Sequence, residues 1–356
     1  MPNKIITFAE SVNEALIYSL KKDKNMICYG LGTTDPKNIF STTKNLESLF
    51  GSDRIFDVPT SENALTGISI GAALNKVRSV VSHQRVDFAL LAMDQIINSA
   101  AKWHYMFGSN SSVPITIRLI IGRGWGQGPT HSQSLQSLFV NIPGLKVVVP
   151  SNPQNCYDLL VASIFDPNPV IFIEHRWLHN ISSKVIKKKK YNLNQNTLKI
   201  LSKGKDLTIV SMSFATVESL HVVNKLKEEG IYCELIDINV LKPLKYEKII
   251  NSVKKTGRLL VIDTDTNICG FGSEIISVIS QKIFKYLKKS PIKLAMPDVP
   301  VPTSYGLTKD FYYSKNEIIK KIKILIDCKK ILLAESFFKK QKGFHDVPGT
   351  WFNGPF

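Results

Sequence analysis

The sequence predicts an α/β protein made of two domains, each with a parallel sheet covered by helices. Two observations predict this class. Short segments that are apolar throughout alternate along the 356 residues with longer segments whose apolar residues recur at helical spacing. The alternation stops near residue 181 and resumes near residue 202. Strands without a polar face are typical of parallel sheets buried on both sides, and two sets of them in a chain of this length indicate two domains.

The first half contains the larger set of alternating elements. Residues 5–20 carry apolar side chains at helical spacing, among them Phe8, Val12 and Leu16, and residues 25–30 form an apolar run typical of a buried strand. The same patterns predict strands at 54–57, 79–82, 114–121, 146–149 and 170–174, and helices at 63–74, 88–106, 132–139 and 153–165. We therefore expect a first domain over residues 1–180.

The second half repeats the alternation on a smaller scale after a break. Residues 181–201 include a run of lysines and an Asn-rich stretch, show neither period, and are predicted to be a linker. Beyond them the patterns predict strands at 207–211, 233–238, 258–263 and 293–296, and helices at 216–229, 247–255, 272–287 and 315–326. The expected second domain spans residues 202–335. Residues 336–356, rich in Lys, Gly, Pro and aromatic side chains, form a tail.

Composition excludes several classes of protein. A hydrophobic fraction of 44% and a charged fraction of 21% are ordinary for a globular chain, which excludes wholesale disorder. No run approaches the ~18–20 apolar residues of a membrane span, and the N-terminus has no apolar signal core, so we expect a cytoplasmic protein without membrane contact. Five scattered cysteines with no Cys-x-x-Cys pair argue against a disulfide framework and against a zinc site.

The formal charge of +17 is concentrated in the second half. Residues 1–180 hold 15 Lys and Arg against 13 Asp and Glu, whereas residues 181–356 hold 31 against 16, so the two halves carry +2 and +15. The excess lysines are not interleaved with aromatic residues as in a nucleic-acid-binding surface. We interpret them as solvated surface or, as the next choice, as a docking face for an acidic protein, and we expect no nucleic-acid partner.

Residues 122–128 form the most glycine-rich segment, between a predicted strand and a predicted helix. Their Gly-x-Gly-x-Gly-x-Gly spacing differs from the dinucleotide-binding Gly-x-Gly-x-x-Gly, and no acidic residue lies between Arg123 and Tyr157 to hold a ribose. The chain also lacks the Gly-Lys-Ser/Thr of a phosphate-binding loop. We therefore interpret residues 122–128 as a loop shaped for a substrate or, alternatively, as a plain structural turn.

Two ionisable residues stand where helices are predicted to start. His131 follows the glycine-rich segment, where an imidazole would meet a substrate carboxylate or carbonyl unless its role is structural. Glu62 follows a strand and directly precedes the predicted helix over 63–74, where the helix N-terminus favours an ionised carboxylate. From these residues alone, helix capping by Glu62 is favoured over catalysis.

A series of motifs then resembles one known family in order along the chain. They are Asp57-Val-Pro-Thr-Ser-Glu62, Gly67-Ile-Ser-Ile-Gly71, Asp87-Phe88-Ala89, residues 93–102, Val113-Pro-Ile-Thr-Ile-Arg118, His131-Ser-Gln-Ser134, residues 142–150 and residues 166–174. From about Ile6 to about Ile326 the chain resembles the β subunit of thiamine-diphosphate-dependent 2-oxo acid dehydrogenases. This is the pyruvate and branched-chain class, whose decarboxylating component has two kinds of subunit.

The resemblance implies a pyrimidine-binding transketolase-like domain followed by a transketolase C-terminal-like domain. In this family an α subunit holds the diphosphate and its magnesium ion through a Gly-Asp-Gly motif, and the β subunit grips the aminopyrimidine. This chain contains no Gly-Asp-Gly. We therefore expect half of an active site, in an α2β2 heterotetramer that decarboxylates a 2-oxo acid and passes the acyl group to a lipoyl-bearing acyltransferase.

Two other functions stay open on the sequence. A two-chain, transketolase-like carboligating enzyme would transfer the enamine to an aldehyde and would need no lipoyl acceptor. A Lys-rich scaffold or nucleic-acid-binding protein would keep the fold without the chemistry, but the joint presence of Glu62, Phe88 and His131 argues against it.

The resemblance also assigns roles to individual residues. Glu62 matches the family's acid/base glutamate, which shares a proton with the distal nitrogen of the pyrimidine ring. Phe88 matches the aromatic residue stacked on that ring, unless it is an ordinary core residue, and Gln84 is counted among the cofactor-binding residues. His131 matches the histidine that orients the 2-oxo acid.

A potassium ion near the strand that enters the active site is also implied by the resemblance. The matching positions are Ile115, Ser163, Ile164, Asp166 and Asn168. Three of them would bind through backbone carbonyls, so their side chains carry little information. Asp166 and Asn168, in an Asp-Pro-Asn-Pro sequence, equally suit a plain turn.

Three segments depart from the family pattern by adding cationic or ionisable residues. They introduce Arg85 before the stacking phenylalanine, Arg123 in the glycine-rich segment, and His175 and Arg176 at the end of a strand. Around a substrate mouth, such groups suit a larger, polar or doubly anionic 2-oxo acid rather than pyruvate. We predict substrate contacts for Arg85, Arg123 and His175. The alternative is that the arginines pair with carboxylates of the α subunit.

Overall fold

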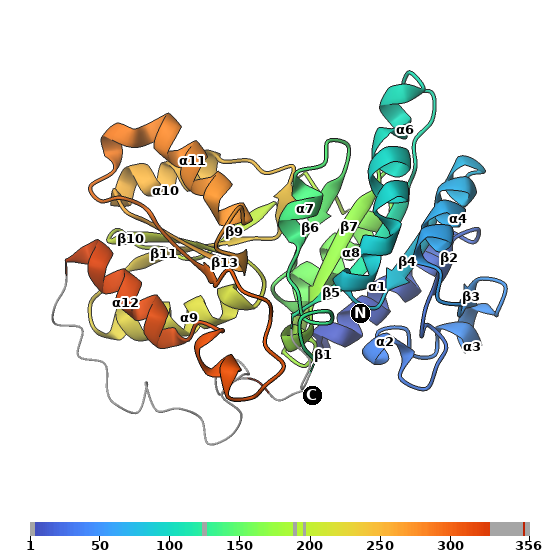
Figure 1. Cartoon of the computed structure of the whole chain (residues 1–356), viewed down its shortest axis with the longest axis horizontal. Coiled ribbons are helices and arrows are strands. Elements are labelled where there is room, and N and C mark those ends of the chain that lie inside the picture. The colour runs from blue at the N-terminus through green and yellow to red at the C-terminus, as the bar shows by residue number, and fades with distance from the viewer. Residues whose placement is uncertain (1–3, 123–126, 188–190, 195–196, 328–351, 353–356) are drawn as a thin grey trace.

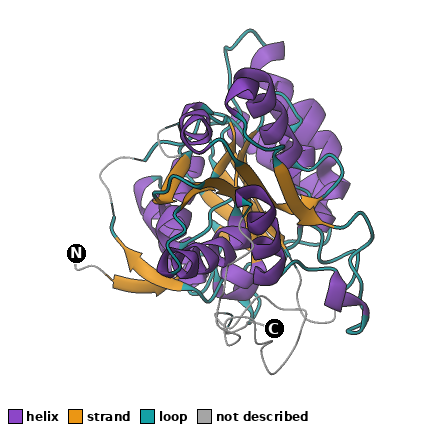
Figure 2. Ribbon diagram, turned by 90° about the vertical axis from the view of Figure 1, so that its left-hand side faces the viewer, coloured by secondary structure: helices purple, strands orange, loops and turns teal. Residues whose placement is uncertain are grey.

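The computed structural model of the chain describes residues 4–122, 127–187, 191–194, 197–327 and 352. A seven-stranded sheet and a five-stranded sheet each form the centre of one lobe (Figure 1), and helices lie on both sides of the strands (Figure 2). A separate antiparallel pair joins β1 (Lys4–Thr7) to β8 (Ser182–Val185). The predicted class, two α/β units with mainly parallel sheets, is confirmed.

The seven-stranded sheet has the strand order β12-β6-β7-β5-β4-β2-β3. Its strands from the first half are β2 (Ile27–Gly30), β3 (Ile55–Phe56), β4 (Ser79–His83), β5 (Ile115–Ile121), β6 (Lys146–Val148) and β7 (Val170–His175). All six run parallel to one another, and Ile117 at the centre lies opposite Val81 and Ile171. The seventh strand, β12 (Val240–Lys242), comes from the second half and pairs antiparallel with β6.

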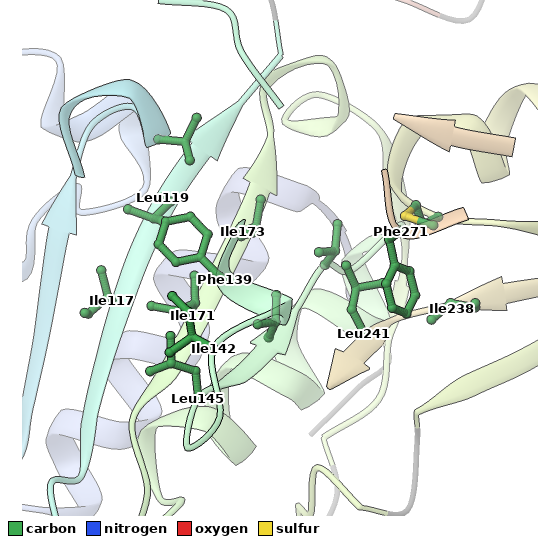
Figure 3. Close-up of a cluster of buried hydrophobic side chains, with 14 of the residues drawn as sticks. Ile117, Leu119, Phe139, Ile142, Leu145, Ile171, Ile173, Ile238, Leu241 and Phe271 are labelled. Atoms are coloured by element: carbon green, nitrogen blue, oxygen red, sulfur yellow. The ribbon is translucent and has the colours of Figure 1, made fainter. Parts of the chain in front are cut away.

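Two apolar cores lie on the two faces of this sheet, because neighbouring strand residues point in opposite directions. Val80 of β4 packs with α1 (Phe8–Lys22) and α8 (Pro153–Ile164), whereas Val81 packs on the side of α4 (Glu62–Leu74). Figure 3 shows the second core, where Phe139 lies beside strand residues and from which apolar side chains continue to Phe271 of the other lobe. The two lobes therefore share one apolar core.

The five-stranded sheet has the order β14-β13-β10-β11-β9. Its strands are β9 (Leu198–Ser202), β10 (Leu207–Ser211), β11 (Cys233–Ile238), β13 (Leu259–Thr266) and β14 (Ile292–Met296). Only β9 runs antiparallel to its neighbour. The helices of this lobe are α9 (Ser213–Glu228), α10 (Glu247–Thr256), α11 (Phe271–Ile283) and α12 (Lys315–Ile326).

Several predicted elements differ from the structure. The predicted linker over 181–201 contains β8 and the start of β9, which are edge strands with exposed side chains and so lack the apolar run that marks the other strands. The first helix begins at Phe8 rather than residue 5, because Thr7 and Glu10 form a capping box there. Two short elements, α2 (Asn38–Ser41) and α3 (Leu46–Phe50), are too short to show a helical period.

Two predicted helices near the candidate site also differ. The helix predicted over 88–106 is divided into α5 (Val86–Ala89), a 3₁₀ turn (Leu90–Ala92), a π-helical stretch (Gln95–Ala100) and α6 (Ala101–Met106). Apolar spacing separates these helix types poorly. The helix predicted over 132–139 is α7 and begins at Gln136. Among the described residues, no helix combines the length and apolar character needed to cross a membrane.

Candidate functional site

Glu62 is the first residue of α4, directly after the loop that follows β3. Its side chain is 7% exposed, and within the described part of the chain no group forms a hydrogen bond or ion pair with its carboxylate. Because the carboxylate bonds to none of the free backbone N–H groups of the first turn, the capping role that the sequence favoured has no support here.

The first turn of α4 is fixed from the neighbouring strand. The Thr66 hydroxyl donates to the carbonyl oxygen of Glu62 at 2.9 Å and lies 3.0 Å from Nε2 of His83, at the end of β4. Burial lowers the pKa of His83 to about 4, so its imidazole is neutral at physiological pH. A neutral imidazole that donates from Nε2 completes this hydrogen-bond chain.

Phe88 and His131, 43 positions apart in sequence, meet edge to face with ring centroids 5.2 Å apart. Beside them, Nε2 of Gln133 donates to Oδ1 of Asp87 at 2.7 Å. Nδ1 of His131 lies 3.0 Å from the Thr130 hydroxyl. The prediction that His131 opens a helix is wrong, because it lies in a turn five residues before α7 begins.

Gln84 is half-buried and lies against the turn that follows β2. Gly32 in that turn has φ +81°, a backbone conformation that favours glycine, and Nε2 of Gln84 lies in the space that a Cβ atom would occupy. The amide of Gly32 also donates to Asp57 Oδ1 at 2.8 Å. The cofactor-binding role of Gln84 stays a prediction.

Of the three residues predicted to contact substrate, two are engaged within the chain. Arg85 is buried, and its guanidinium donates to the carbonyl oxygen of Gly122 at 2.9 Å and to the side chain of Gln127. His175 is also buried and accepts a hydrogen bond from the amide of Trp177 at 3.2 Å. Burial, helped by nearby His179 and Arg85, lowers the pKa of His175 to about 3. Arg123 lies outside the described residues.

A buried ion pair joins two neighbouring strands, and the sequence reasoning missed it. Nε and Nη2 of Arg118 on β5 donate to the two carboxylate oxygens of Glu174 on β7, at 2.6 and 3.1 Å. Burial alone would raise the pKa of Glu174, but Arg118 and His179 lower it to about 2. The missed signal is one charged residue in each of two otherwise apolar strands, since an unpaired charge is rarely buried.

Two of the five residues predicted to hold potassium, Ile164 and Asp166, are engaged by cations of the chain itself. Nη1 of Arg78 donates to the carbonyl oxygens of Ile164 and Asp166 at 2.7 and 3.3 Å. Nζ of Lys146 contacts both carboxylate oxygens of Asp166, at 2.7 and 2.6 Å. A third cation at this place would be repelled by both, so the arrangement does not fit a resident potassium ion.

The other predicted members of that cation set also make local contacts. The amide of Asn168 donates to Asp166 Oδ1 at 2.9 Å, and the Ser163 hydroxyl donates to the carbonyl oxygen of Leu159 at 2.7 Å. Ile115 is buried at the start of β5. In the part of the chain that the structure describes, no three His, Cys, Asp or Glu residues gather to hold a metal ion.

Comparison with known proteins places this geometry in context. The family model "Transketolase, pyrimidine binding domain" matches residues 4–180, and "Transketolase, C-terminal domain" matches residues 196–318. The chain is similar to the pyruvate dehydrogenase E1 component subunit beta of Acholeplasma laidlawii, with 31% identity over 302 residues, covering 85% of this chain and 92% of that protein.

A second relative and a solved structure extend the comparison. The acetoin:2,6-dichlorophenolindophenol oxidoreductase subunit beta of Cupriavidus necator is 35% identical over 312 residues, which cover 85% of this chain and 91% of that protein. The structure of a split gene transketolase, described as an inactive beta4 tetramer, superposes with a TM-score of 0.73 and 19% identity over 91% of this chain and 99% of that chain. This last likeness shows the fold alone.

Proposed function

Since the chain belongs to the β-subunit family of thiamine-diphosphate-dependent 2-oxo acid dehydrogenase E1 components, we propose that Glu62, Phe88 and His131 form its half of the active site. The observation that carries the proposal is the edge-to-face contact of Phe88 with His131 at 5.2 Å. The fold brings two residues that the resemblance assigns to cofactor and substrate into direct contact. The two-chain carboligating alternative is not favoured, because the relatives above 30% identity are named as dehydrogenase or oxidoreductase subunits.

Glu62 fits the cofactor because its carboxylate has no hydrogen-bond partner among the described residues, and its oxygens are not fully enclosed by the chain. A ligand can therefore reach them and supply a hydrogen bond that the chain does not. Thiamine diphosphate, when bound, would supply the nucleophilic carbon and the electron sink that decarboxylation of a 2-oxo acid requires. Glu62 holds and returns the proton at the distal nitrogen of the aminopyrimidine.

Phe88 and His131 carry out the remaining steps assigned to this chain. The Phe88 ring would pack against the aminopyrimidine and would exclude water from that side of it. His131 is partly exposed in its turn, where its imidazole donates a hydrogen bond to the carboxylate or carbonyl oxygen of the 2-oxo acid and orients it. Of the residues predicted for substrate recognition, only Arg123 keeps that assignment, because Arg85 and His175 are used within the chain.

An α subunit completes the site in this proposal. The chain has no Gly-Asp-Gly motif, so the diphosphate and magnesium are assigned to the α chain of an α2β2 assembly, and the acyl group to a lipoyl-bearing acyltransferase. The outer face of α4, on the side of the helix opposite to Glu62, offers a surface for a partner chain. Ile68 is 56% exposed there, and a Cβ atom at Gly71 would meet nothing within 4 Å, so a helix of another chain can approach closely.

Substitution of Glu62 tests the proposal in the enzyme reconstituted with its α subunit. Glu62→Gln should lower 2-oxo acid decarboxylation, followed with an artificial electron acceptor, by about 10²–10⁴-fold. The matched control is Glu47→Gln on exposed α3, which should change neither activity nor folding. Turnover near that of the unmodified enzyme in Glu62→Gln would remove the acid/base assignment.

A further inference from the structure

Arg85 connects the two sides of the glycine-rich segment. It follows β4, and its side chain is 3% exposed. Nη1 donates to the carbonyl oxygen of Gly122 at 2.9 Å, and Nη2 donates to Oε1 of Gln127. The acceptors stand before and after residues 123–126. One planar guanidinium that donates to both fixes the distance between them, which a lysine ammonium cannot reproduce.

The acceptor on the far side leads directly to His131. The Ser132 hydroxyl donates to the backbone carbonyl of Gln127 at 2.7 Å, and the amide of His131 donates to the carbonyl of Gly128 at 3.2 Å. Residues 127–132 therefore form a turn closed by hydrogen bonds. Its first residue is held by Arg85, and its fifth carries the imidazole.

Two more contacts join the segment of Arg85 to this turn and to the residue directly after it. Asp87 accepts from Gln133 Nε2 at 2.7 Å, and the Phe88 ring meets the His131 ring at 5.2 Å. Displacing Arg85 would therefore disturb the position of His131 relative to Phe88.

The charge of Arg85 is directed to the chain itself rather than toward a ligand. Within the described residues it makes no ion pair with a carboxylate, and its guanidinium carbon lies 5.5 Å from the ring centroid of Phe40. Burial lowers its pKa to about 10, which leaves it charged at neutral pH. On the near side, the His175 ring packs against Gly122, where a Cβ atom would lie 2.3 Å from Cε1.

We propose that Arg85 is a positioning residue that sets the spacing of Gly122 and Gln127 and thereby places His131. The inference rests on the proposed function, in which His131 orients the 2-oxo acid. It replaces the substrate contact that the sequence predicted for Arg85. Its consequence is that loss of the guanidinium disturbs every 2-oxo acid substrate alike, because the disturbed group is the imidazole that all of them meet.

The test compares Arg85→Met and Arg85→Lys in the complex with the α subunit. Hydrogen exchange of peptides covering residues 127–135 should be faster in both variants. In both, kcat for pyruvate and for 2-oxoglutarate should fall by a similar factor, about 10²-fold in Arg85→Met, with little change in KM. The control Arg258→Met removes an arginine that donates to the carbonyl of Leu325 at 2.8 Å in the other lobe, and it should change neither measurement.

Two results would overturn the proposal. Unchanged exchange over residues 127–135 in a folded Arg85 variant would refute the positioning role, whether or not the complex is active, because exchange is measured without turnover. A rise in KM confined to 2-oxoglutarate, with kcat preserved, would make Arg85 a substrate ligand. If Arg85→Met does not fold, Arg85→Lys decides. Failure of the proposed function is recognised separately, as absence of decarboxylation by the unmodified complex.

Discussion

Buried carboxylates serve different purposes in the two lobes. In the first lobe, Glu62 is buried with no hydrogen bond to its carboxylate from any described residue. In the second lobe, Asp237, Asp263 and Asp265 are as deeply buried, and each accepts several hydrogen bonds. We infer from this difference that Glu62 is left for a ligand, as in the proposed function, whereas the three aspartates of the second lobe serve as structural hydrogen-bond acceptors.

The donors to these acidic residues show what the second lobe holds in place. Each of these carboxylates accepts at least one hydrogen bond from the first lobe, including those from the Ser151 hydroxyl to Asp237 at 2.5 Å, Gln136 Nε2 to Asp263 at 3.2 Å, and the Ser137 amide to Asp265 at 3.1 Å. Two of the three donors lie in α7, which follows the turn of His131. The second lobe thus anchors the element next to the candidate site.

The largest expected effect on stability is at Glu174, which, unlike Glu62 in the same lobe, forms an ion pair. Glu174→Gln leaves the buried Arg118 without its counter-charge, so the free energy of unfolding should fall by about 3–5 kcal/mol. Urea denaturation would measure it. The exposed pair of Lys289 and Asp327 is the control, and Asp327→Asn should cost less than about 1 kcal/mol. Equal losses in the two variants would contradict the assigned role of Glu174.

The pH dependence of stability tests the anchoring carboxylates. Burial, with the charge of Asp263, raises the pKa of Asp265 to about 6 from an ordinary value of 3.8. Between these values the folded protein binds more protons than the unfolded chain, so this contribution to stability is complete below pH 4 and is lost as the pH rises through 6. Asp265→Asn should therefore gain up to about 3 kcal/mol relative to the unmodified protein between pH 4 and 7.5. Urea denaturation of both proteins across this pH range would measure the difference. If their free energies of unfolding changed in parallel with pH, the prediction would be wrong.

A smaller loss of stability is expected for substitution of Asp237, which accepts hydrogen bonds from both lobes. Asp237 accepts from Ser151, Thr216 and Asn239 at 2.5, 2.8 and 2.9 Å. Asp237→Asn replaces one accepting oxygen with a donor that faces other donors, which should lower the free energy of unfolding by about 1–3 kcal/mol. The activity of the folded variant should be nearly unchanged. A large loss of activity without loss of stability would bring Asp237 into the chemistry.

The smallest expected effect is a change of turnover with salt concentration, caused by the lysines of the second half. If part of the +15 charge attracts an acidic acyl-acceptor domain, raising the salt concentration to ~1 M, where the Debye length is ~3 Å, should slow acceptor-dependent turnover. Turnover with an artificial electron acceptor should change less. Equal salt sensitivity in the two assays would leave the lysines as solvated surface.

Much of the fold could be predicted because buried parallel strands are marked by uninterrupted apolar runs. The elements that could not be predicted lack this signal. β12 is a short strand whose pairing with β6 depends on contacts far apart in sequence. β1 and β8 pair at the edge, where Ile5 is 72% exposed. The spacing of apolar residues along the sequence indicates which residues are buried. Exposed edge strands and short turns bury few residues, so this spacing does not reveal them.

The candidate site could be predicted as a set of residue types but not as a set of contacts. The order of motifs pointed to Glu62, Phe88 and His131, and the structure brings the last two together. It could not show that Arg85 donates to backbone and side-chain oxygens of its own chain, because an arginine in a loop has the same sequence signature whether it binds a ligand or holds a turn. Arg123 and most of the tail lie outside the described residues, although Phe352 is buried near Trp177.

Cofactor binding tests most directly whether this chain holds one half of a shared active site. Calorimetric titration of thiamine diphosphate with magnesium would be carried out on the purified chain and on its complex with the α subunit. We expect weak or undetectable binding to the chain alone and tight binding to the complex. Tight binding to the chain alone would contradict a shared site.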